Sequence, residues 1–250
     1  ELIGLENVRV LSPQKGALLK LVTFVPEAYA DLVRTTLFNA GAGAIGDYDS
    51  CSFSLPGSGT FRAGEGTNPF CGEIGELHVE SEIRIETILP AFRKSTVTRA
   101  LLSVHPYEEP VWNIVNLDNT NPVTGFGIIG ELAEPADSLP FLQQVKKTFR
   151  CKVVRHTAIC KSQIRKVAVC GGSGAFLTSA AIAQGADIYI TGDYKYHDFF
   201  QAENRLILTD IGHYESEQFT KEIFYELVTK KISNFAIQFS KVETNPIHYL

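Results

Sequence analysis

The order of strand and helix signals in residues 18–117 constrains the fold of this chain more than any other sequence feature. Apolar, β-branched runs alternate with segments whose apolar residues recur at helical spacing. The expected strands are 18–25, 44–53, 77–89 and 110–117, and the expected helices begin at Pro26 and Pro90. This β-α-β-β-α-β order is the split pattern of ferredoxin-like sandwiches, so we predict an α+β domain over residues 8–119.

The second half follows a different pattern after the polar segment 118–122. Short apolar strands alternate with helices, which is typical of an α/β layer with a largely parallel sheet. The expected strands are 126–132, 153–158, 167–170, 188–191 and 206–209, and the expected helices are 139–149, 175–184, 194–202 and 214–230. The sequence therefore predicts an α/β domain over residues 120–250.

Composition excludes several classes of protein. The 250 residues carry 23 basic and 28 acidic side chains, a net charge of −5, which disfavours nucleic-acid binding. No run reaches the roughly 18 apolar residues of a membrane span. The five cysteines are odd in number and include no C-x-x-C pair, which indicates buried thiols in a reducing cytoplasm. Cys170 is a poor nucleophile candidate because no base is identifiable near it.

The strongest chemical motif is Asp210–Glu217, which follows an expected strand and opens an expected helix. His213 and Glu217 are one helical turn apart and can bind one metal ion through imidazole nitrogen and carboxylate oxygen. On one continuous helix they share a side with the apolar residues Phe219, Ile223, Phe224, Leu227 and Val228. An inward carboxylate needs a partner or a metal. The alternative is an acidic first helical turn beside a hydrogen-bonded histidine.

A second motif is Thr191–Asp198, at the carboxyl end of the expected strand 188–191, where α/β sheets bind ligands. Asp193 is either a helix cap or a substrate-side group. Lys195 could meet an anionic substrate, and His197 is the candidate catalytic proton carrier.

A third motif joins a strand to a helix through glycines. Gly171, Gly172 and Gly174 could present backbone N–H groups to a phosphate, although the spacing matches neither nucleotide-binding fingerprint. The alternative is a close-packed turn without a ligand.

The remaining histidines are interpreted as structural. The segment Ser103–Pro110 contains two prolines, which favours a rigid connector over a metal site. His78, His156 and His248 have no partner at ligand spacing.

Several of these motifs together resemble a known family. GGSGA, GADIYITGDYKYHDFF, TDIGHYESE and the ending KVETNPIHYL resemble the carboxyl-terminal half of the Nif-three-like family, also labelled GTP cyclohydrolase I type 2 homolog. Residues 8–119, including HPYEEP, resemble the inserted domain of longer bacterial members. That insert is similar to the ferredoxin-like trimer proteins of nitrogen regulation and copper tolerance (PII/CutA-like).

The resemblance implies two divalent metal ions, zinc, iron or manganese, and assembly into homotrimers or homohexamers. It implies that His213 and Glu217 are metal ligands beside a His pair and an Asp from the family's amino-terminal part, and that Asp193 and His197 belong to a second-shell or substrate-side element. No His-His pair occurs in these 250 residues, so we expect that part to lie outside this sequence.

The expected function is a cytoplasmic, metal-dependent hydrolase acting on a small molecule, such as a nucleotide or phosphoester. The alternative is a metal-binding regulatory module without catalysis, in which the Gly- and Pro-rich loop expected at 55–75 binds a ligand or partner. A third possibility is metal trafficking or storage.

Overall fold

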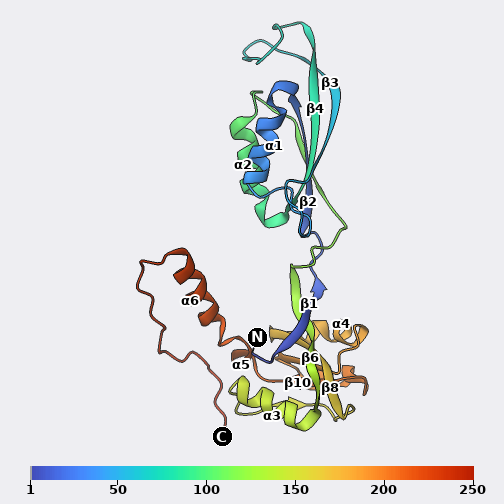
Figure 1. Ribbon diagram of the computed structural model, residues 1–250, viewed down its shortest axis with the longest axis vertical. Helices are drawn as coiled ribbons and strands as arrows, with labels where there is room; N and C mark the ends of the chain where they lie inside the picture. Colours follow the sequence, from blue (N-terminus) through green and yellow to red (C-terminus); the bar gives the residue numbers. More distant parts are fainter. Residues whose placement is uncertain (1) are drawn as a thin grey trace. The chain divides into compact units, whose positions relative to one another are not determined.

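The computed structural model describes residues 2–250, and the chain divides into two compact units. One unit, here called the inserted unit, is Gln14–Asn121. The other, the flanking unit, combines the described residues up to Pro13 with Pro122–Leu250 (Figure 1). Within the described residues, no helix has the length and apolar character needed to cross a membrane.

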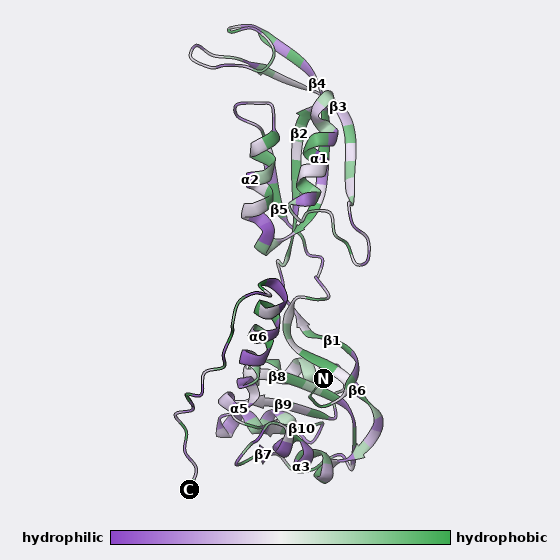
Figure 2. Cartoon of the chain, turned by 60° about the vertical axis from the view of Figure 1, so that its left-hand side comes forward, coloured by the Kyte–Doolittle hydropathy of each residue, from purple (hydrophilic) through white to green (hydrophobic). Residues whose placement is uncertain are grey.

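The inserted unit has the expected ferredoxin-like fold. Its elements are β2 (Leu18–Pro26), α1 (Ala30–Asn39), β3 (Ser52–Arg62), β4 (Leu77–Pro90), α2 (Lys94–Val104) and β5 (Trp112–Asn116), and short 3-10 turns η1 (Glu27–Tyr29) and η2 (Ala91–Arg93) precede the helices. The antiparallel sheet has the order β3-β4-β2-β5. Both helices carry hydrophobic and hydrophilic residues (Figure 2), and their apolar sides pack on the sheet around the fully buried Leu21, Val33, Leu37, Ile85 and Leu101.

The β3–β4 hairpin is longer than the sequence predicted. The strand expected at 44–53 was wrong, since residues 44–51 form only an isolated bridge and β3 begins at Ser52. Residues 55–62 were expected in a loop but pair with β4 along the whole of β3. A side chain at Gly59 would collide with Glu82, so this glycine allows close strand pairing rather than a turn. The loop itself is residues 63–76.

The flanking unit is built on a six-stranded sheet of order β1-β6-β8-β9-β10-β7. Its strands are β1 (Leu5–Pro13), β6 (Gly125–Asp137), β7 (Arg155–His156), β8 (Gln163–Ser173), β9 (Ile188–Gly192) and β10 (Ile207–Asp210), and its helices are α3 (Ser138–Thr148), α4 (Thr178–Ala183), α5 (His213–Glu217) and α6 (Thr220–Lys231), with 3-10 turns η3 (Ala175–Leu177) and η4 (Tyr196–Ala202). Only β8/β9 and β9/β10 are parallel, so the largely parallel sheet expected from the sequence is a mixed sheet.

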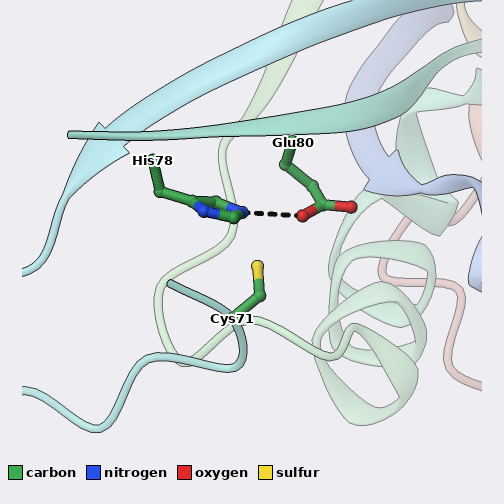
Figure 3. A group of neighbouring side chains, drawn as sticks. All are labelled: Cys71, His78 and Glu80. Atoms are coloured by element: carbon green, nitrogen blue, oxygen red, sulfur yellow. Dashed lines mark hydrogen bonds and ion pairs between the residues drawn. The ribbon is translucent and has the colours of Figure 1, made fainter. Parts of the chain in front are cut away.

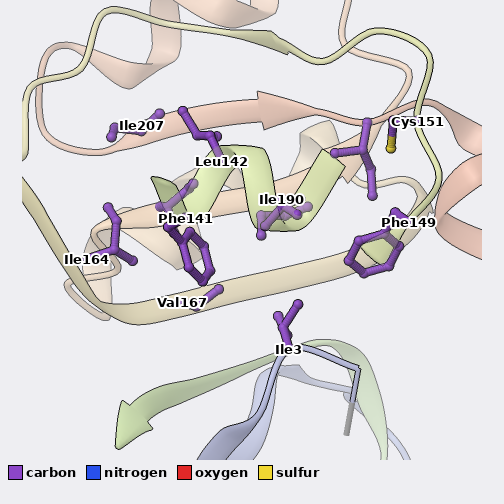
Figure 4. Close-up of a cluster of buried hydrophobic side chains, with 12 residues drawn as sticks. Ile3, Phe141, Leu142, Phe149, Cys151, Ile164, Val167, Ile190 and Ile207 are labelled. Carbon is purple, nitrogen blue, oxygen red and sulfur yellow. The ribbon is translucent and has the colours of Figure 1, made fainter. Parts of the chain in front are cut away.

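Two apolar clusters hold this sheet. One contains Phe141 and Val145 of α3 packed on Ile164, Val167 and Ile190 (Figure 4). The other is built around the fully buried Tyr189. Burial of each such side chain contributes roughly 1.5–3 kcal/mol, so the central strands are the rigid part of the unit.

The predicted boundary of the first domain needs a correction. The expected domain began at residue 8, but residues 5–13 form β1, which pairs with β6 of the flanking unit. Strand β1 is missed by periodicity because Asn7 has a positive φ and the register shifts between Glu6 and Arg9.

Stability of the inserted unit should fall in mild acid because His105 is buried in its neutral form. Its Nδ1 accepts from the Tyr107 N–H at 3.2 Å, which leaves Nε2–H to donate to the Phe24 carbonyl at 2.9 Å. Burial lowers the pKa of His105 below its ordinary 6.5. A depressed histidine pKa means that the unfolded state takes up the proton first. Stability is therefore complete above about pH 6.5 and decreases as pH falls below it.

Urea midpoints measured between pH 7.5 and 5.5 should decline in the parent and decline less in His105→Gln. The exposed His248→Gln serves as the control and should retain the parental slope. An unchanged slope in His105→Gln would contradict this account.

Candidate functional site

Three of the sequence motifs meet at one edge of the flanking sheet. Strands β8, β9 and β10 are parallel neighbours, so their carboxyl ends lie side by side. Gly171 and Gly172 lie in the last residues of β8, where its pairing with β9 is irregular, Asp193 follows β9, and His213 follows β10. The parallel centre of the sheet therefore assembles residues that are about 20 positions apart in the sequence.

His213 lies between two carboxylates. Its Nδ1 is 2.6 Å from Asp193 Oδ2, and its Nε2 is 3.1 Å from Glu217 Oε2. The hydrogen bond with Asp193 is the main reason that the pKa of His213 is raised above its ordinary value, and Glu217 adds to this. Asp193 reaches the ring from a left-handed backbone conformation with φ 60°. The arrangement predicted at i, i+4 therefore contains a third group, Asp193.

Asp193 has a different role from the helix cap considered above. The 3-10 turn η4 is capped by Asp198, whose Oδ2 accepts from the Lys195 N–H at 3.0 Å. Asp193 is thus free to hold His213. Sequence analysis placed Asp193 in the motif Thr191–Asp198. It could not pair Asp193 with His213, which is 20 residues away in the chain.

Gly172 allows the β8 turn to pass directly beside this pair. Its φ is +64°, and a Cβ there would lie 2.6 Å from Glu217 Oε1 and 3.3 Å from His213 Cε1. The Gly172 N–H already donates to Ser216 Oγ at 2.7 Å, and that hydroxyl donates to the His213 carbonyl at 2.7 Å. The glycine therefore connects β8 to α5.

Gly174 is also closely packed, whereas Gly171 is not. A Cβ at Gly174 would lie 2.5 Å from Tyr189 Oη, and the Gly174 carbonyl accepts from that hydroxyl at 2.7 Å. A Cβ at Gly171 would only touch Glu217 at 3.6 Å. Packing explains Gly172 and Gly174, and phosphate binding by the turn stays a prediction.

Asp210 positions both motifs and received no role from sequence reasoning. It is buried, and its Oδ2 accepts from the Tyr194 N–H at 2.9 Å while its Oδ1 accepts from the Gly212 N–H at 2.8 Å. Arg155 completes an ion pair with it. The sequence could have indicated this role, because Asp210 is a carboxylate at the end of an apolar strand. Burying such a charge is costly unless it is paired.

The inward orientation predicted for His213 and Glu217 was wrong. Their side chains are about half-exposed, at 47 % and 50 %, while Glu215 is buried. The helix is not continuous, because α5 ends at Glu217 and α6 begins at Thr220. The apolar phase of α6 therefore does not extend back to His213, and its residues Ile223, Phe224 and Leu227 are exposed.

His197 and Lys195 lie on the neighbouring η4 segment and are exposed. The His197 ring packs with Tyr196 and Phe200 at centroid distances of 5.2 and 6.4 Å. Neither residue is brought into the Asp193–His213–Glu217 group by an interaction that the structure describes. Cys170 is half-buried, which raises its thiol pKa and disfavours a nucleophilic role. All five cysteines are free thiols, but only Cys151 is fully buried.

The geometry fits a metal centre. Metal–ligand bonds of about 2.0–2.2 Å place neighbouring ligand atoms on one ion roughly 3 Å apart, close to the 3.1 Å between His213 Nε2 and Glu217 Oε2. A Nδ1–H donated to Asp193 leaves the Nε2 lone pair free, which is the carboxylate–histidine–metal arrangement. Two ligands are fewer than the three that catalytic sites commonly use, so this pair alone does not complete a catalytic metal centre.

Proteins of one family resemble this chain in sequence and fold. The family model for Duf34/NIF3 (NGG1p interacting factor 3) matches residues 1–246. The GTP cyclohydrolase 1 type 2 homolog of Halalkalibacterium halodurans is 40 % identical over 253 residues, covering 99 % of this chain and 68 % of the relative. The protein of the same name in Bacillus subtilis is 36 % identical over 260 residues, with 100 % and 68 % covered.

A solved structure described as a Bacillus cereus protein related to NIF3 is also similar. It has a TM-score of 0.78 and 37 % identity, and the match covers 100 % of this chain and 68 % of that one. A Staphylococcus aureus protein matches at a TM-score of 0.63 and 25 % identity, with 100 % and 66 % covered. The matches thus include the inserted unit as well as the carboxyl-terminal motifs.

Removing the Asp193 charge should lower the pKa of His213. The carboxylate stabilises the imidazolium, so Asp193→Asn should move the titration of the His213 ring toward its ordinary value. Proton NMR titration of the ring C–H signals measures this directly. Asp198→Asn, which removes a charge from the same turn, should change the midpoint less. Equal midpoints in Asp193→Asn and the parent would contradict the pairing.

Gly172→Ala should disturb the contact between His213 and Glu217 as well as strain the backbone. A left-handed alanine costs about 1–2 kcal/mol in either Gly172→Ala or Gly185→Ala, since both glycines have positive φ. Gly185 has open space around it, whereas a methyl group at Gly172 displaces the Glu217 carboxylate. Unfolding midpoints should fall similarly, and only Gly172→Ala should shift the His213 ring signals. Unshifted signals in that variant would refute the close approach.

Proposed function

Because the chain belongs to the Duf34/NIF3 family, we propose that His213 and Glu217 are ligands of a divalent-metal centre in a metal-dependent hydrolase. The observation that carries this proposal is the Asp193–His213–Glu217 array at the carboxyl edge of the parallel strands. Imidazole and carboxylate suit zinc, iron or manganese, and the centre holds two such ions once the remaining ligands are supplied. A bound metal of this kind lowers the pKa of a water molecule and polarises the bond to be broken.

The residues of this chain divide the work around that centre. Asp193 Oδ2 accepts a hydrogen bond from the His213 Nδ1–H, which fixes the tautomer and aims Nε2 toward Glu217. Ser216 and Gly172 hold the first turn of α5 against β8. Asp210 accepts hydrogen bonds from the backbone of both the turn after β9 and the turn after β10, and so holds the two turns together.

The proposed substrate is an anionic small molecule. The relatives carry the name GTP cyclohydrolase 1 type 2 homolog, which supports a nucleotide or related phosphoester as the class to test. Lys195 extends from the turn that follows Asp193 and is proposed to meet the substrate's negative charge. His197, on the same segment, is the proposed proton carrier, and Gly171 the first N–H donor to a substrate phosphate.

The proposed protein is a cytoplasmic homo-oligomer, a trimer or hexamer. The exposed apolar side chains of α6 support assembly, because water-facing Ile223, Phe224 and Leu227 on one helix are costly in a monomer. A second copy of the chain is the proposed cover, and light scattering of the parent against Phe224→Glu tests it.

A second candidate function is a ligand-binding module in the inserted unit. A cavity of about 830 Å³ lies between β3, the 63–76 loop and the segment Tyr107–Val111. Its lining combines Phe24, Phe61 and Phe70 with the charged Glu82 and Arg84, a pattern typical of small-molecule sites. Under this alternative the protein binds a ligand and a metal ion but catalyses no reaction.

Metal titration with residue-specific detection tests the first function. Zn²⁺ or Mn²⁺ added near pH 7.5 should shift or broaden the His213 ring signals of this chain. Asp193→Asn should weaken that binding about 10–100-fold, as expected for loss of an orienting partner. Glu217→Gln should weaken it further, and His248→Gln should leave it unchanged.

Turnover separates the two functions. Hydrolysis of nucleotides or phosphoesters that disappears in His213→Ala supports the enzyme. Binding of the same compounds that persists without turnover, and is lost on deletion of 63–70, supports the module. If millimolar metal leaves the His213 ring signals unchanged, the proposed metal centre is refuted.

A further inference from the structure

A second group of metal-ligating side chains lies in the inserted unit. The ligand atoms of Cys71, His78 and Glu80 all lie within 4.8 Å of one another (Figure 3). His78 and Glu80 are two residues apart in β4, so they share one face of the strand. Figure 3 shows the Cys71 sulfur aimed at the gap between them from the 63–76 loop. The prediction that His78 has no partner at ligand spacing was wrong, because Glu80 lies 2.8 Å from its Nε2 and Cys71 approaches from the loop.

The loop that carries Cys71 is held tightly against the strand. Gly72 has φ +78°, and a Cβ there would lie 2.9 Å from His78 Cβ and Cγ, so the backbone crosses directly over the histidine. The Gly75 N–H donates to the Ala63 carbonyl at 2.8 Å, and the Phe61 ring packs on His78 at 5.2 Å. The three ligands are half-buried rather than spread over an open surface.

The three side chains lie close enough together to bind one cation. His78 Nε2 lies 2.8 Å from Glu80 Oε2, and the Cys71 sulfur lies within 4.8 Å of both ligand atoms. One negative carboxylate therefore faces two groups that could exchange protons for a metal ion.

The ligand types identify the kind of ion. Thiolate and imidazole prefer zinc among the common biological divalent cations, whereas magnesium, calcium and manganese prefer oxygen ligands. A single carboxylate completes a sulfur, nitrogen and oxygen set of three. Three protein ligands leave one tetrahedral position for water or another small ligand.

We propose that Cys71, His78 and Glu80 form a zinc site in the inserted unit, separate from the His213–Glu217 pair. On binding, the Cys71 sulfur bonds to Zn²⁺ and its proton passes to solvent, so one proton is released for each ion bound. The ion then links the 63–76 loop to β4. Phe70, next to Cys71, lines the 830 Å³ cavity, so zinc occupancy orders one wall of that cavity.

A cobalt and zinc titration of the full 250-residue chain tests the site. The background is His213→Ala with Glu217→Gln, so the other predicted ligands cannot contribute and the result does not depend on the proposed hydrolase. Under reducing conditions, Co²⁺ should bind with one equivalent and produce thiolate-to-cobalt charge-transfer absorption, and Zn²⁺ should displace it. Zn²⁺ should also raise the unfolding temperature by mass action.

Matched variants decide the ligand set. Cys71→Ser should abolish the charge-transfer band and weaken Zn²⁺ binding by at least about 10-fold, the lower end of what even an outer-shell change produces. Glu80→Gln should weaken Zn²⁺ binding but retain the band. Cys51→Ser, which removes another half-buried thiol of the same unit, should change neither.

Three results would overturn the proposal: no thiolate band in the background chain, a band that survives Cys71→Ser, or a band that Cys51→Ser removes. Circular dichroism of each variant confirms that it is folded. Glu80→Gln keeps size and hydrogen bonding, so it tests the site even where Cys71→Ser unfolds the loop.

Discussion

The buried Asp210 carboxylate is the interaction on which the rest of the candidate site depends. Burying a charge without partners costs several kcal/mol, and Asp210 is kept by Arg155 and by two backbone N–H donors. Those donors belong to Tyr194 and Gly212, the residues that follow Asp193 and precede His213. One carboxylate therefore sets the distance between the turns after β9 and β10. The contact of His213 with Asp193 follows from that spacing.

Local patterns predicted what local physics determines. Apolar runs and prolines placed both helices and three of the four strands of the inserted unit, and helical spacing paired His213 with Glu217. The pattern failed where tertiary packing overrides it. Residues 55–62 look like a loop because they contain glycines, but the glycines let β3 pair closely with β4 around Glu82. The break between α5 and α6 likewise reversed the predicted orientation of His213, because a helical wheel assumes a continuous helix.

Contacts between distant residues could not be predicted from this one sequence. Asp193 meets His213 because β9 and β10 are parallel neighbours, and Cys71 meets His78 because Gly72 lets a loop cross over β4. In each case both residues can be recognised in the sequence as chemically capable. That they are neighbours depends on how distant parts of the chain pack together. Gly172 and Gly185 illustrate the same limit. Both have a positive φ, but only Gly172 has a functional group against its Cα, and nothing in the local sequence distinguishes them.

The two proposed ligand groups differ in the atoms that they offer to a metal ion. His213 and Glu217 offer nitrogen and oxygen to an ion at a half-exposed edge, which suits metals that exchange ligands with substrate and water. Cys71 adds sulfur to the same two atom types, and its loop closes over them. Sulfur increases the preference for zinc over manganese, so the proposed site in the inserted unit would select zinc more strongly than a nitrogen and oxygen pair would. A single measurement of total metal per chain would merge these two populations, so occupancy has to be assigned residue by residue.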